Sequence, residues 1–384
     1  MSDAACDVAV AGGGLVGLSL AYELATRGLS VTVIDAAHAG RATDAGAGIL
    51  SPATNAVADE LWWALGSAAG EHYASLVARL SDGGADTAAT GYGTCGLLSI
   101  GLRESEDPWF DPFARLVQGR PRSAVHEIST TEARALFPPL GPIHRALYNP
   151  DACRVDGRGM AAALRHGAGQ HGVVLVEGVV SGLVEGGSGS GPRTLAAVHV
   201  DGHRDVRCGA LAVAGGAWTA AMGEWLDAAL PISPTKGQIV HLGVEGDTGR
   251  WPILQPLLTH YVVPWPGGRV ACGGTFEVGA GFSTTVTAGG LHELLRECLS
   301  VAPGLAAAEH LFTRVGLRPT SPDDRPLTGR LPGWSNAWVN TGHGANGLLL
   351  GPYTSRLLAE HMVGTAGSDG GGATIGPLDP ARFC

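Results

Sequence analysis

The chain has 384 residues, 60 of them glycine, and a formal charge of −10 at pH 7. This length allows two domains and a sizeable core, whereas the negative charge, without any Lys/Arg run, argues against nucleic acid and anionic membranes as partners. No apolar stretch reaches the roughly 18–20 residues that span a bilayer, and Asp3 and Asp7 stand where a secretion signal would be basic. We therefore expect a cytoplasmic, enzyme-sized protein with no membrane span.

The first predicted elements are a strand over residues 7–11 and a helix over residues 15–27, joined by a glycine-rich turn. Gly12, Gly14 and Gly17 have the GxGxxG spacing. In such a turn the first glycine permits the tight bend and the second lets the backbone approach a pyrophosphate. The third lets the helix pack closely against the strand. The N–H groups at the helix N-terminus also favour phosphate.

A second strand, SVTVID, follows this helix and ends at Asp35. A carboxylate at this place can accept hydrogen bonds from ribose hydroxyls and disfavours a 2′-phosphate, and therefore NADP. Strand, glycines, helix, strand and acid in this order favour dinucleotide binding over a purely structural βαβ unit.

The middle of the chain alternates between helices and strands. Ala, Leu and Trp spacing predicts a helix over residues 60–80, and residues 90–150 are predicted to form short strands and turns. A helix from Gly157 leads into one apolar strand, and the glycine-serine break at 186–192 is predicted to be a hairpin tip or an exposed linker. LAVAGGAWT at 211–219 should be a strand that returns to the dinucleotide-binding sheet and enters a helix.

The C-terminal third has the alternating pattern of an antiparallel sheet. Residues 231–312 include QIVHL and HYVVPW, with a helix predicted at 288–301. Residues 313–363 combine the strand NAWVN, a glycine-rich turn and a helix over 352–362. The glycine-rich stretch 364–374 is predicted to be mobile.

Cysteine and histidine show no metal-binding pattern. The seven cysteines form no CxxC pair, and no histidine stands at metal-ligand spacing from them. We therefore predict reduced thiols and no metal site.

Three further strings determine the family expectation: GRATDAGAGIL at 40–50, FSTTVTAGGLHELL at 282–295 and GLRPTSPDDRPLTG at 316–329. Together with NTGHGANGLLLG at 340–351, they resemble the flavin-dependent D-amino acid oxidase superfamily, and most closely its glycine/sarcosine oxidase branch. The resemblance covers nearly the whole chain. It implies FAD rather than NAD as the cofactor.

The resemblance also implies a mixed α/β fold with two domains. A Rossmann-like FAD-binding domain would be built from the discontinuous residues 1–55, 150–225 and 313–384. A substrate domain based on a large antiparallel sheet would comprise residues 56–149 and 226–312.

The FAD contacts implied by position fall in four segments. The first turn contributes Gly12, Gly14, Leu15, Val16 and Gly17, and the end of the second strand contributes Asp35 and Ala36. The loop that follows contributes Ala42, Thr43, Ala47, Gly48 and Ile49. The C-terminal glycine-rich turn contributes His343, Gly344, Ala345, Asn346, Gly347, Leu348 and Leu349, and Val180 is an isolated position on the adenine side. The terminal turn would wrap the flavin ring. Because that turn contains no cysteine, we expect noncovalent FAD.

Three side chains are candidates for the chemistry. Arg318 matches the arginine that binds the substrate carboxylate in this family, and a guanidinium can make two charge-assisted bonds to a carboxylate. The alternative for Arg318 is a structural ion pair with Asp323 or Asp324. Tyr261 matches a tyrosine of the substrate sheet, or is simply a core residue. His343 is either a cofactor contact or a general base.

The sequence departs from the glycine oxidase pattern at Gly344 and Ala345, where those enzymes carry an aromatic residue and an arginine. This smaller, less charged lining suggests a bulkier or differently charged substrate than glycine. GHG at 342–344 also resembles the D-amino acid dehydrogenase branch, which passes electrons to quinones.

The expected activity is FAD-dependent oxidation of the C–H bond next to an amine in a small amino acid, with oxygen or another electron acceptor. Rival hypotheses within the fold are a D-amino acid or 2-hydroxy acid dehydrogenase that uses an acceptor other than oxygen, and an amine or hydrazino-acid oxidase of a specialised pathway. Two further rivals are a noncatalytic flavoprotein subunit and an NAD-dependent enzyme. The resemblance also leaves a homo-oligomer open.

Overall fold

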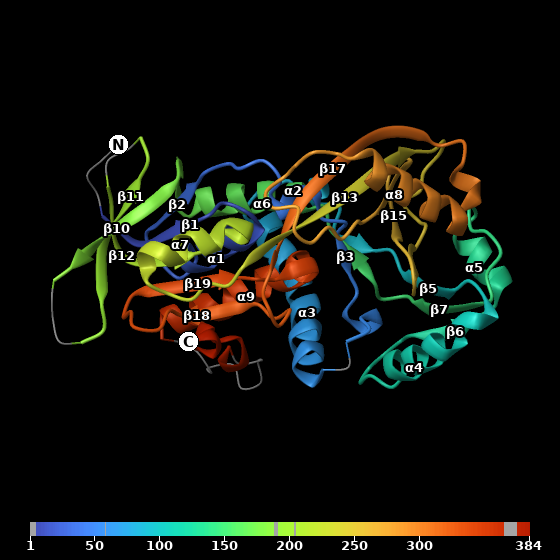
Figure 1. Ribbon diagram of the computed structural model, residues 1–384, viewed down its shortest axis with the longest axis horizontal. Coiled ribbons are helices and arrows are strands. Elements are labelled where there is room, and N and C mark those ends of the chain that lie inside the picture. The colour runs from blue at the N-terminus through green and yellow to red at the C-terminus, as the bar shows by residue number, and fades with distance from the viewer. Residues whose placement is uncertain (1–4, 58, 188–190, 203–204, 365–374) are drawn as a thin grey trace.

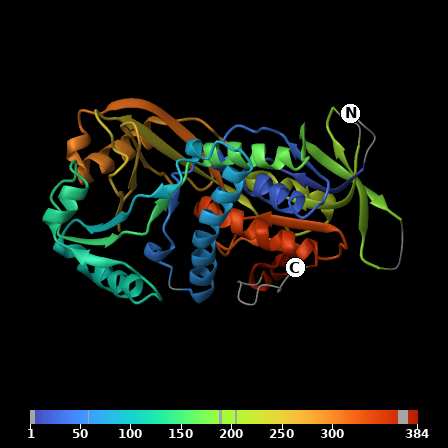
Figure 2. The same ribbon diagram turned by 180° about the vertical axis from the view of Figure 1, so that it is seen from behind.

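The computed structural model describes residues 5–57, 59–187, 191–202, 205–364 and 375–384. Two eight-stranded sheets lie toward opposite ends of an elongated molecule (Figure 1), and the view from behind shows the same division (Figure 2). The mixed α/β fold is therefore confirmed. The predicted mobility of residues 364–374 concerns a stretch that, apart from Gly364, lies outside the described residues.

The first sheet is parallel from β9 to β19, with antiparallel strands added by β10, β11 and β18. Its order is β10-β11-β12-β1-β2-β9, and β12 also pairs with β19, which pairs with β18. β1, β2, β9, β12 and β19 are mutually parallel, as expected for a dinucleotide-binding sheet. The strands are β1 (Cys6–Ala11), β2 (Val31–Asp35), β9 (Val174–Glu177), β10 (Val180–Gly186), β11 (Thr194–Val200), β12 (Val206–Val213), β18 (Leu327–Arg330) and β19 (Ala337–Thr341).

Helices cover both faces of this sheet. On one face, α1 (Leu15–Ala25), α3 (Glu60–Asp82), α6 (Gly157–Gln170) and α9 (Gly347–Met362) share a buried apolar cluster with β1. On the other face, α7 (Thr219–Leu226) packs against β12 and β19 through a second cluster. The two clusters hold the carboxyl ends of the parallel strands at one edge of the sheet.

The second sheet is antiparallel apart from one pair, β14 with β5. Its order is β17-β13-β16-β15-β14-β5-β7-β6. α8 (Ala288–Val301) covers one face, where Leu294 and Val301 pack with Leu98 and Val240. The strands are β5 (Leu97–Gly101), β6 (His126–Ile128), β7 (Arg145–Asn149), β13 (Ser233–Gly243), β14 (Ile253–Pro256), β15 (Tyr261–Trp265), β16 (Arg269–Gly273) and β17 (Glu309–Thr320).

A small third sheet connects the two parts of the molecule. It contains β3 (Ile49–Leu50), β8 (Cys153–Arg154) and β4 (Gly93–Thr94). α2 (Ala42–Ala45) lies beside it in sequence and contacts β17 of the second sheet.

The prediction of only strands and turns over residues 90–150 is wrong. This stretch also contains α4 (Asp107–Gln118) and α5 (Thr130–Leu136). Pro112 inside α4 masks the helical pattern. The start of α5 has a sequence signal that was overlooked, because Ser129 and Glu132 form a reciprocal capping box.

Other boundaries differ in smaller ways. The single apolar strand predicted after α6 is two strands, β9 and β10, which separate at Gly178. β10 and β11 pair antiparallel on either side of the break at 186–192, of which residues 188–190 lie outside the described residues. α9 begins at Gly347 and includes Pro352. β17 spans the proposed domain boundary at residue 313 and belongs to the second sheet, so the division into domains stays a prediction.

Candidate active site

A cavity of about 380 Å³ lies where the carboxyl ends of β1, β2, β12 and β19 meet the second sheet. Its walls include every residue predicted to bind cofactor or substrate except Gly17. They are Gly12, Gly14, Leu15, Val16, Asp35, Ala36, Ala42, Thr43, Ala47, Gly48, Ile49, Val180, Tyr261, Arg318, His343, Gly344, Ala345, Asn346, Gly347, Leu348 and Leu349. The fold thus brings together residues from all four predicted segments.

The glycine-rich turn shapes one end of the cavity. Gly12 has a φ of +118°, and a Cβ atom there would lie 2.3 Å from the carbonyl oxygen of Ala214. Gly14 precedes α1 without a side-chain cap, while the Thr43 hydroxyl accepts a hydrogen bond from the Leu15 N–H at 3.0 Å. Uncapped N–H groups at a helix N-terminus attract phosphate. The turn therefore fits the pyrophosphate of a dinucleotide.

Gly17 lies behind this turn and acts through packing. A Cβ atom at Gly17 would lie 1.9 Å from the carbonyl oxygen of Gly12. Only glycine therefore allows α1 to approach β1 this closely.

Asp35, at the end of β2, faces the cavity but has a partner that sequence reasoning missed. Arg41 donates a hydrogen bond to Asp35 Oδ2 at 2.7 Å and another to Asp44 at 3.1 Å. Arg41 also lines the cavity. Arg41 is the second residue of the GRATDAGAGIL string. Its place in a string expected to contact FAD is the sequence signal that could have identified it. This ion pair fixes the carboxylate and puts a cation beside the expected ribose and phosphates.

An aromatic stack at the cavity was also missed. The Trp218 ring lies between those of His38 and Phe282, with centroid distances of 4.6 and 5.6 Å. Trp218 and His38 line the cavity. Because these residues come from three distant segments, no local sequence pattern predicts their contact.

His343 is buried and neutral. Its Nε2 atom lies 2.9 Å from the Thr354 hydroxyl, which itself donates to the Gly351 carbonyl. The Nε2 atom must therefore be the donor to Thr354, and Nδ1 has no hydrogen-bond partner among the described residues. Burial lowers the pKa of His343 to about 4. A base this weak suits a cofactor contact better than proton abstraction at neutral pH.

Three buried histidines predict a loss of stability in mild acid. Burial lowers the pKa of His72 and His343 to about 4 and, helped by neighbouring arginines, that of His241 to about 3. Because the unfolded chain binds protons below about pH 6.5, the free energy of unfolding should fall as pH drops from about 6.5 to about 4. Between pH 7 and 5.5 each histidine should contribute about 1 kcal/mol to this loss.

Urea unfolding at pH 7 and 5.5 measures this loss. The His72→Leu variant removes one of the three rings, and His72 does not line the cavity. Its unfolding free energy should differ less between the two pH values. Equal unfolding free energies of the wild type at both values would contradict the assignment of neutral buried rings.

Arg318 and Tyr261 lie together on the second sheet. A Cβ atom on Gly274 would be 3.1 Å from Arg318 Nη2 and 3.2 Å from the Tyr261 hydroxyl, so both polar ends meet at this backbone. Arg318 also donates to the Thr275 carbonyl at 2.9 Å. Burial raises the pKa of Tyr261, and the guanidinium of Arg318 opposes this increase. Tyr261 is therefore a neutral phenol beside a cation.

The alternative ion pair for Arg318 does not form. Asp323 instead accepts a hydrogen bond from Arg382 at 2.8 Å, and within the described ranges no carboxylate makes an ion pair with Arg318. Gly237 keeps the space that the guanidinium uses, because a Cβ atom there would lie 2.3 Å from Arg318 Nη1. An arginine at a cavity wall without an acidic partner is suited to an anionic ligand.

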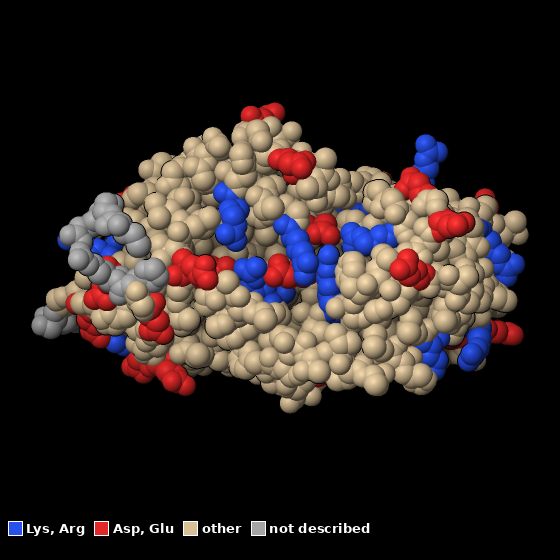
Figure 3. All heavy atoms as spheres, turned by 90° about the horizontal axis from the view of Figure 1, so that it is seen from above, with Lys and Arg blue, Asp and Glu red and all other residues tan. Residues whose placement is uncertain are grey.

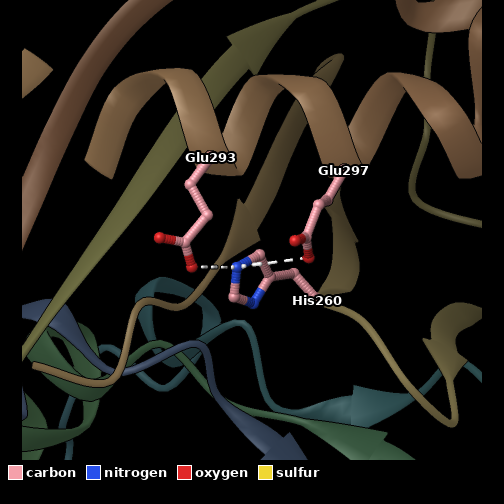
Figure 4. Close-up of side chains that lie close together, drawn as sticks. All are labelled: His260, Glu293 and Glu297. Atoms are coloured by element: carbon pink, nitrogen blue, oxygen red, sulfur yellow. Dashed lines mark hydrogen bonds and ion pairs between the residues drawn. The ribbon is translucent and has the colours of Figure 1, made fainter. Parts of the chain in front are cut away.

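A histidine-glutamate cluster supports this wall from behind. Figure 4 shows His260, next to Tyr261 in the chain, between Glu293 and Glu297 of α8, at 2.9 and 3.4 Å. Although these three side chains have ligand atoms close enough for a metal ion, they are engaged with one another, and Arg296 also donates to Glu297. We interpret the cluster as an anchor between α8 and the start of β15.

Ion pairs join the start of α6 to the second sheet. Asp156 Oδ1 accepts a hydrogen bond from the Arg158 N–H at the start of α6, and Asp156 Oδ2 lies 3.4 Å from Arg269 and 3.8 Å from Arg314. In Figure 3, Lys and Arg side chains cross the middle of the face with Asp and Glu among them. The face shown is thus mixed in charge rather than uniformly basic.

Comparison with known proteins places the chain in a family. The model of the family described as DAO, FAD dependent oxidoreductase, matches residues 7–361. The chain belongs to this family. It is 33% identical over 380 residues to an uncharacterised oxidoreductase of Bacillus subtilis, covering 97% of this chain and 98% of that protein. It is 31% identical to glycine oxidase of Pseudomonas aeruginosa, covering 93% and 94%.

Solved structures agree with this placement. Iminodiacetate oxidase from Chelativorans sp. BNC1 superposes with a TM-score of 0.88 at 33% identity, covering 97% of this chain and 98% of that chain. Glycine oxidase from Geobacillus kaustophilus gives a TM-score of 0.87 at 25% identity, covering 99% of each chain. The predicted resemblance and fold are therefore confirmed, and the protein is an FAD-dependent oxidoreductase. In the part of the chain that the structure describes, no helix combines the length and hydropathy needed to cross a membrane.

Proposed function

We propose that this FAD-dependent oxidoreductase oxidises the C–H bond next to the amine of a small amino acid, of the glycine, N-substituted glycine or D-amino acid type. The observation that carries the proposal is the Arg318 guanidinium at the cavity wall, without a carboxylate partner among the described residues and beside the Tyr261 hydroxyl. The glycine oxidases and the iminodiacetate oxidase among its relatives support an amine as the reacting group.

The chain's own residues have separable tasks in this proposal. Arg318 and Tyr261 hold the substrate carboxylate and thereby orient the α-carbon. The N-terminus of α1 would hold the FAD pyrophosphate and Asp35 the ribose. When bound, FAD accepts the hydride that leaves the α-carbon. Because no cysteine among the described residues lines the cavity, we propose noncovalent binding. The free cysteines accord with a cytoplasmic location.

The net reaction removes two electrons and two protons from the substrate. The C–H bond breaks, the amine loses its proton, and the imine formed adds water to give an oxo acid and an amine or ammonia. Oxygen as the acceptor would be reduced to hydrogen peroxide, whereas a dehydrogenase would pass the electrons to another acceptor. A 2-hydroxy acid would also need a base for its hydroxyl proton, and His343, with a pKa of about 4, is a weak one.

Product analysis tests the proposed reaction. The FAD-bound protein is incubated in air with sarcosine or with glycolate, the corresponding 2-hydroxy acid. We expect glyoxylate and methylamine in equal amounts from sarcosine, with matching peroxide if oxygen is the acceptor. Glyoxylate from glycolate alone would favour the 2-hydroxy acid reaction and contradict amine oxidation.

Ala345 should control how well the site accepts glycine. It lines the cavity two residues after His343. Replacing it with arginine, as in the glycine oxidase pattern, would fill space and add a cation next to the substrate, so Ala345→Arg should raise kcat/KM for glycine about tenfold relative to sarcosine. Steady-state kinetics of both amines measure this ratio. An unchanged ratio in an FAD-loaded variant would contradict this interpretation of the departure.

A further inference from the structure

Gln255 occupies a distinctive place on the substrate side of the cavity. It lies on β14, where Ile253 packs in the cluster on the cavity face and Leu254 packs in the cluster under α8. Since side chains alternate along a strand, Gln255 shares the face of Ile253, and it lines the cavity. The amide of Gln255 is therefore on the face of β14 that looks into the cavity.

The sheet register puts Gln255 next to the carboxylate-binding pair. β14 and β15 are antiparallel with Leu254 opposite Val262, so Gln255 neighbours Tyr261. Tyr261 in turn lies opposite Gly273, which precedes the Gly274 backbone where Arg318 and the tyrosine hydroxyl meet. Cβ atoms of directly opposed residues are about 5 Å apart. Gln255 thus lies one strand beyond Tyr261 on the side away from Arg318.

The amide of Gln255 is uncommitted. Within the described ranges its side chain makes no hydrogen bond. Asn340, another amide of the cavity wall, differs in this respect, because it accepts a hydrogen bond from Thr328 and donates one to Ser355. Because a half-buried amide needs partners, the free donors and acceptor of Gln255 are available to a ligand.

We propose that Gln255 binds the N-substituent of the substrate, and that the preferred substrates are amino acids whose N-substituent bears a carboxylate or carboxamide. This inference rests on the proposed function. With its first carboxylate on Arg318 and Tyr261, a substrate such as glycine is too short to reach the next strand. A carboxymethyl or carbamoylmethyl group on nitrogen extends the molecule by the length of one residue and offers oxygen atoms to the amide N–H groups.

The test compares iminodiacetate, which has a second carboxylate, with sarcosine, which has only an N-methyl group. Rates of flavin reduction under anaerobic conditions are measured for wild type, Gln255→Leu and Gln255→Glu. We expect the preference for iminodiacetate over sarcosine to fall about 10- to 100-fold in Gln255→Leu and further in Gln255→Glu, since like charges repel. Ser99→Ala, on the neighbouring strand opposite Gln255 and outside the cavity wall, should leave the preference at its wild-type value.

The outcomes separate the two proposals. If sarcosine reduces the wild-type flavin but the preference is the same in Gln255→Leu, or if iminodiacetate is not a substrate, the role of Gln255 is overturned and amine oxidation stands. If no amine reduces the wild-type flavin, both proposals are overturned. FAD absorbance of each variant confirms that it is folded, and Gln255→Asn, which shortens the side chain but keeps its amide, should lie between wild type and Gln255→Leu.

Discussion

Replacing Arg318 with alanine should leave FAD bound while substrate-driven flavin reduction becomes at least about 100-fold slower. The guanidinium is expected to make charge-assisted hydrogen bonds to the carboxylate, worth about 1.5–3 kcal/mol each. The Arg318 guanidinium donates a hydrogen bond to the carbonyl of Thr275, which does not belong to the glycine-rich turn expected to bind FAD. The loss should therefore affect substrate and spare the cofactor.

Rapid anaerobic mixing of the FAD-loaded variant with increasing concentrations of sarcosine measures both the affinity for sarcosine and the limiting rate of flavin reduction. Arg318→Lys should recover only part of the activity, because a lysine ammonium cannot form the bidentate pair. Arg330→Ala, at the exposed last residue of the otherwise buried β18, serves as the control for removing an arginine. Wild-type reduction kinetics in Arg318→Ala would show that this residue does not bind the carboxylate.

The second large effect is expected at Gly17. The Cβ atom of an alanine would lie 1.9 Å from the Gly12 carbonyl oxygen, and only movement of backbone could relieve this overlap. Gly17→Ala should therefore lower the free energy of unfolding by about 3 kcal/mol and reduce FAD content, because the shifted turn is the one that fits the pyrophosphate.

Gly169→Ala is the matched control for that substitution. Gly169 is an exposed residue near the end of α6, and nothing lies within 4 Å of its hypothetical Cβ atom. Alanine there should raise stability by about 0.5–1 kcal/mol and keep FAD. Unfolding curves and the ratio of flavin to protein absorbance compare the pair. Equal stability and flavin content in Gly17→Ala and wild type would rule out the close-packing role.

The nucleotide end of the site could be predicted because its signals are local. Gly12, Gly14, Gly17 and Asp35 lie within one strand-helix-strand unit, where spacing alone fixes their relation. α5 also had a local signal in its capping box, whereas Pro112 hid α4. Local patterns thus explain most of the elements found and one that was overlooked.

Contacts between distant segments could not be predicted from local patterns. Gln255 acquires its place only when β14 pairs with β15, and Trp218 meets His38 and Phe282 only in the folded chain. The family resemblance predicts Arg318, whereas the availability of its guanidinium depends on the folded chain, in which Asp323 pairs with Arg382. Such relations depend on sheet register and long-range packing, which no single segment of sequence encodes.

The central claim is that an amine substrate, held by Arg318, delivers its electrons to FAD in this cavity. The most direct measurement is the visible absorbance of the FAD-bound protein mixed without oxygen with glycine, sarcosine, iminodiacetate, D-alanine or D-proline. We predict loss of the oxidised flavin bands with at least one of these amines and none with glycolate or lactate. An unchanged flavin spectrum with every amine, or reduction only by the hydroxy acids, would contradict the account.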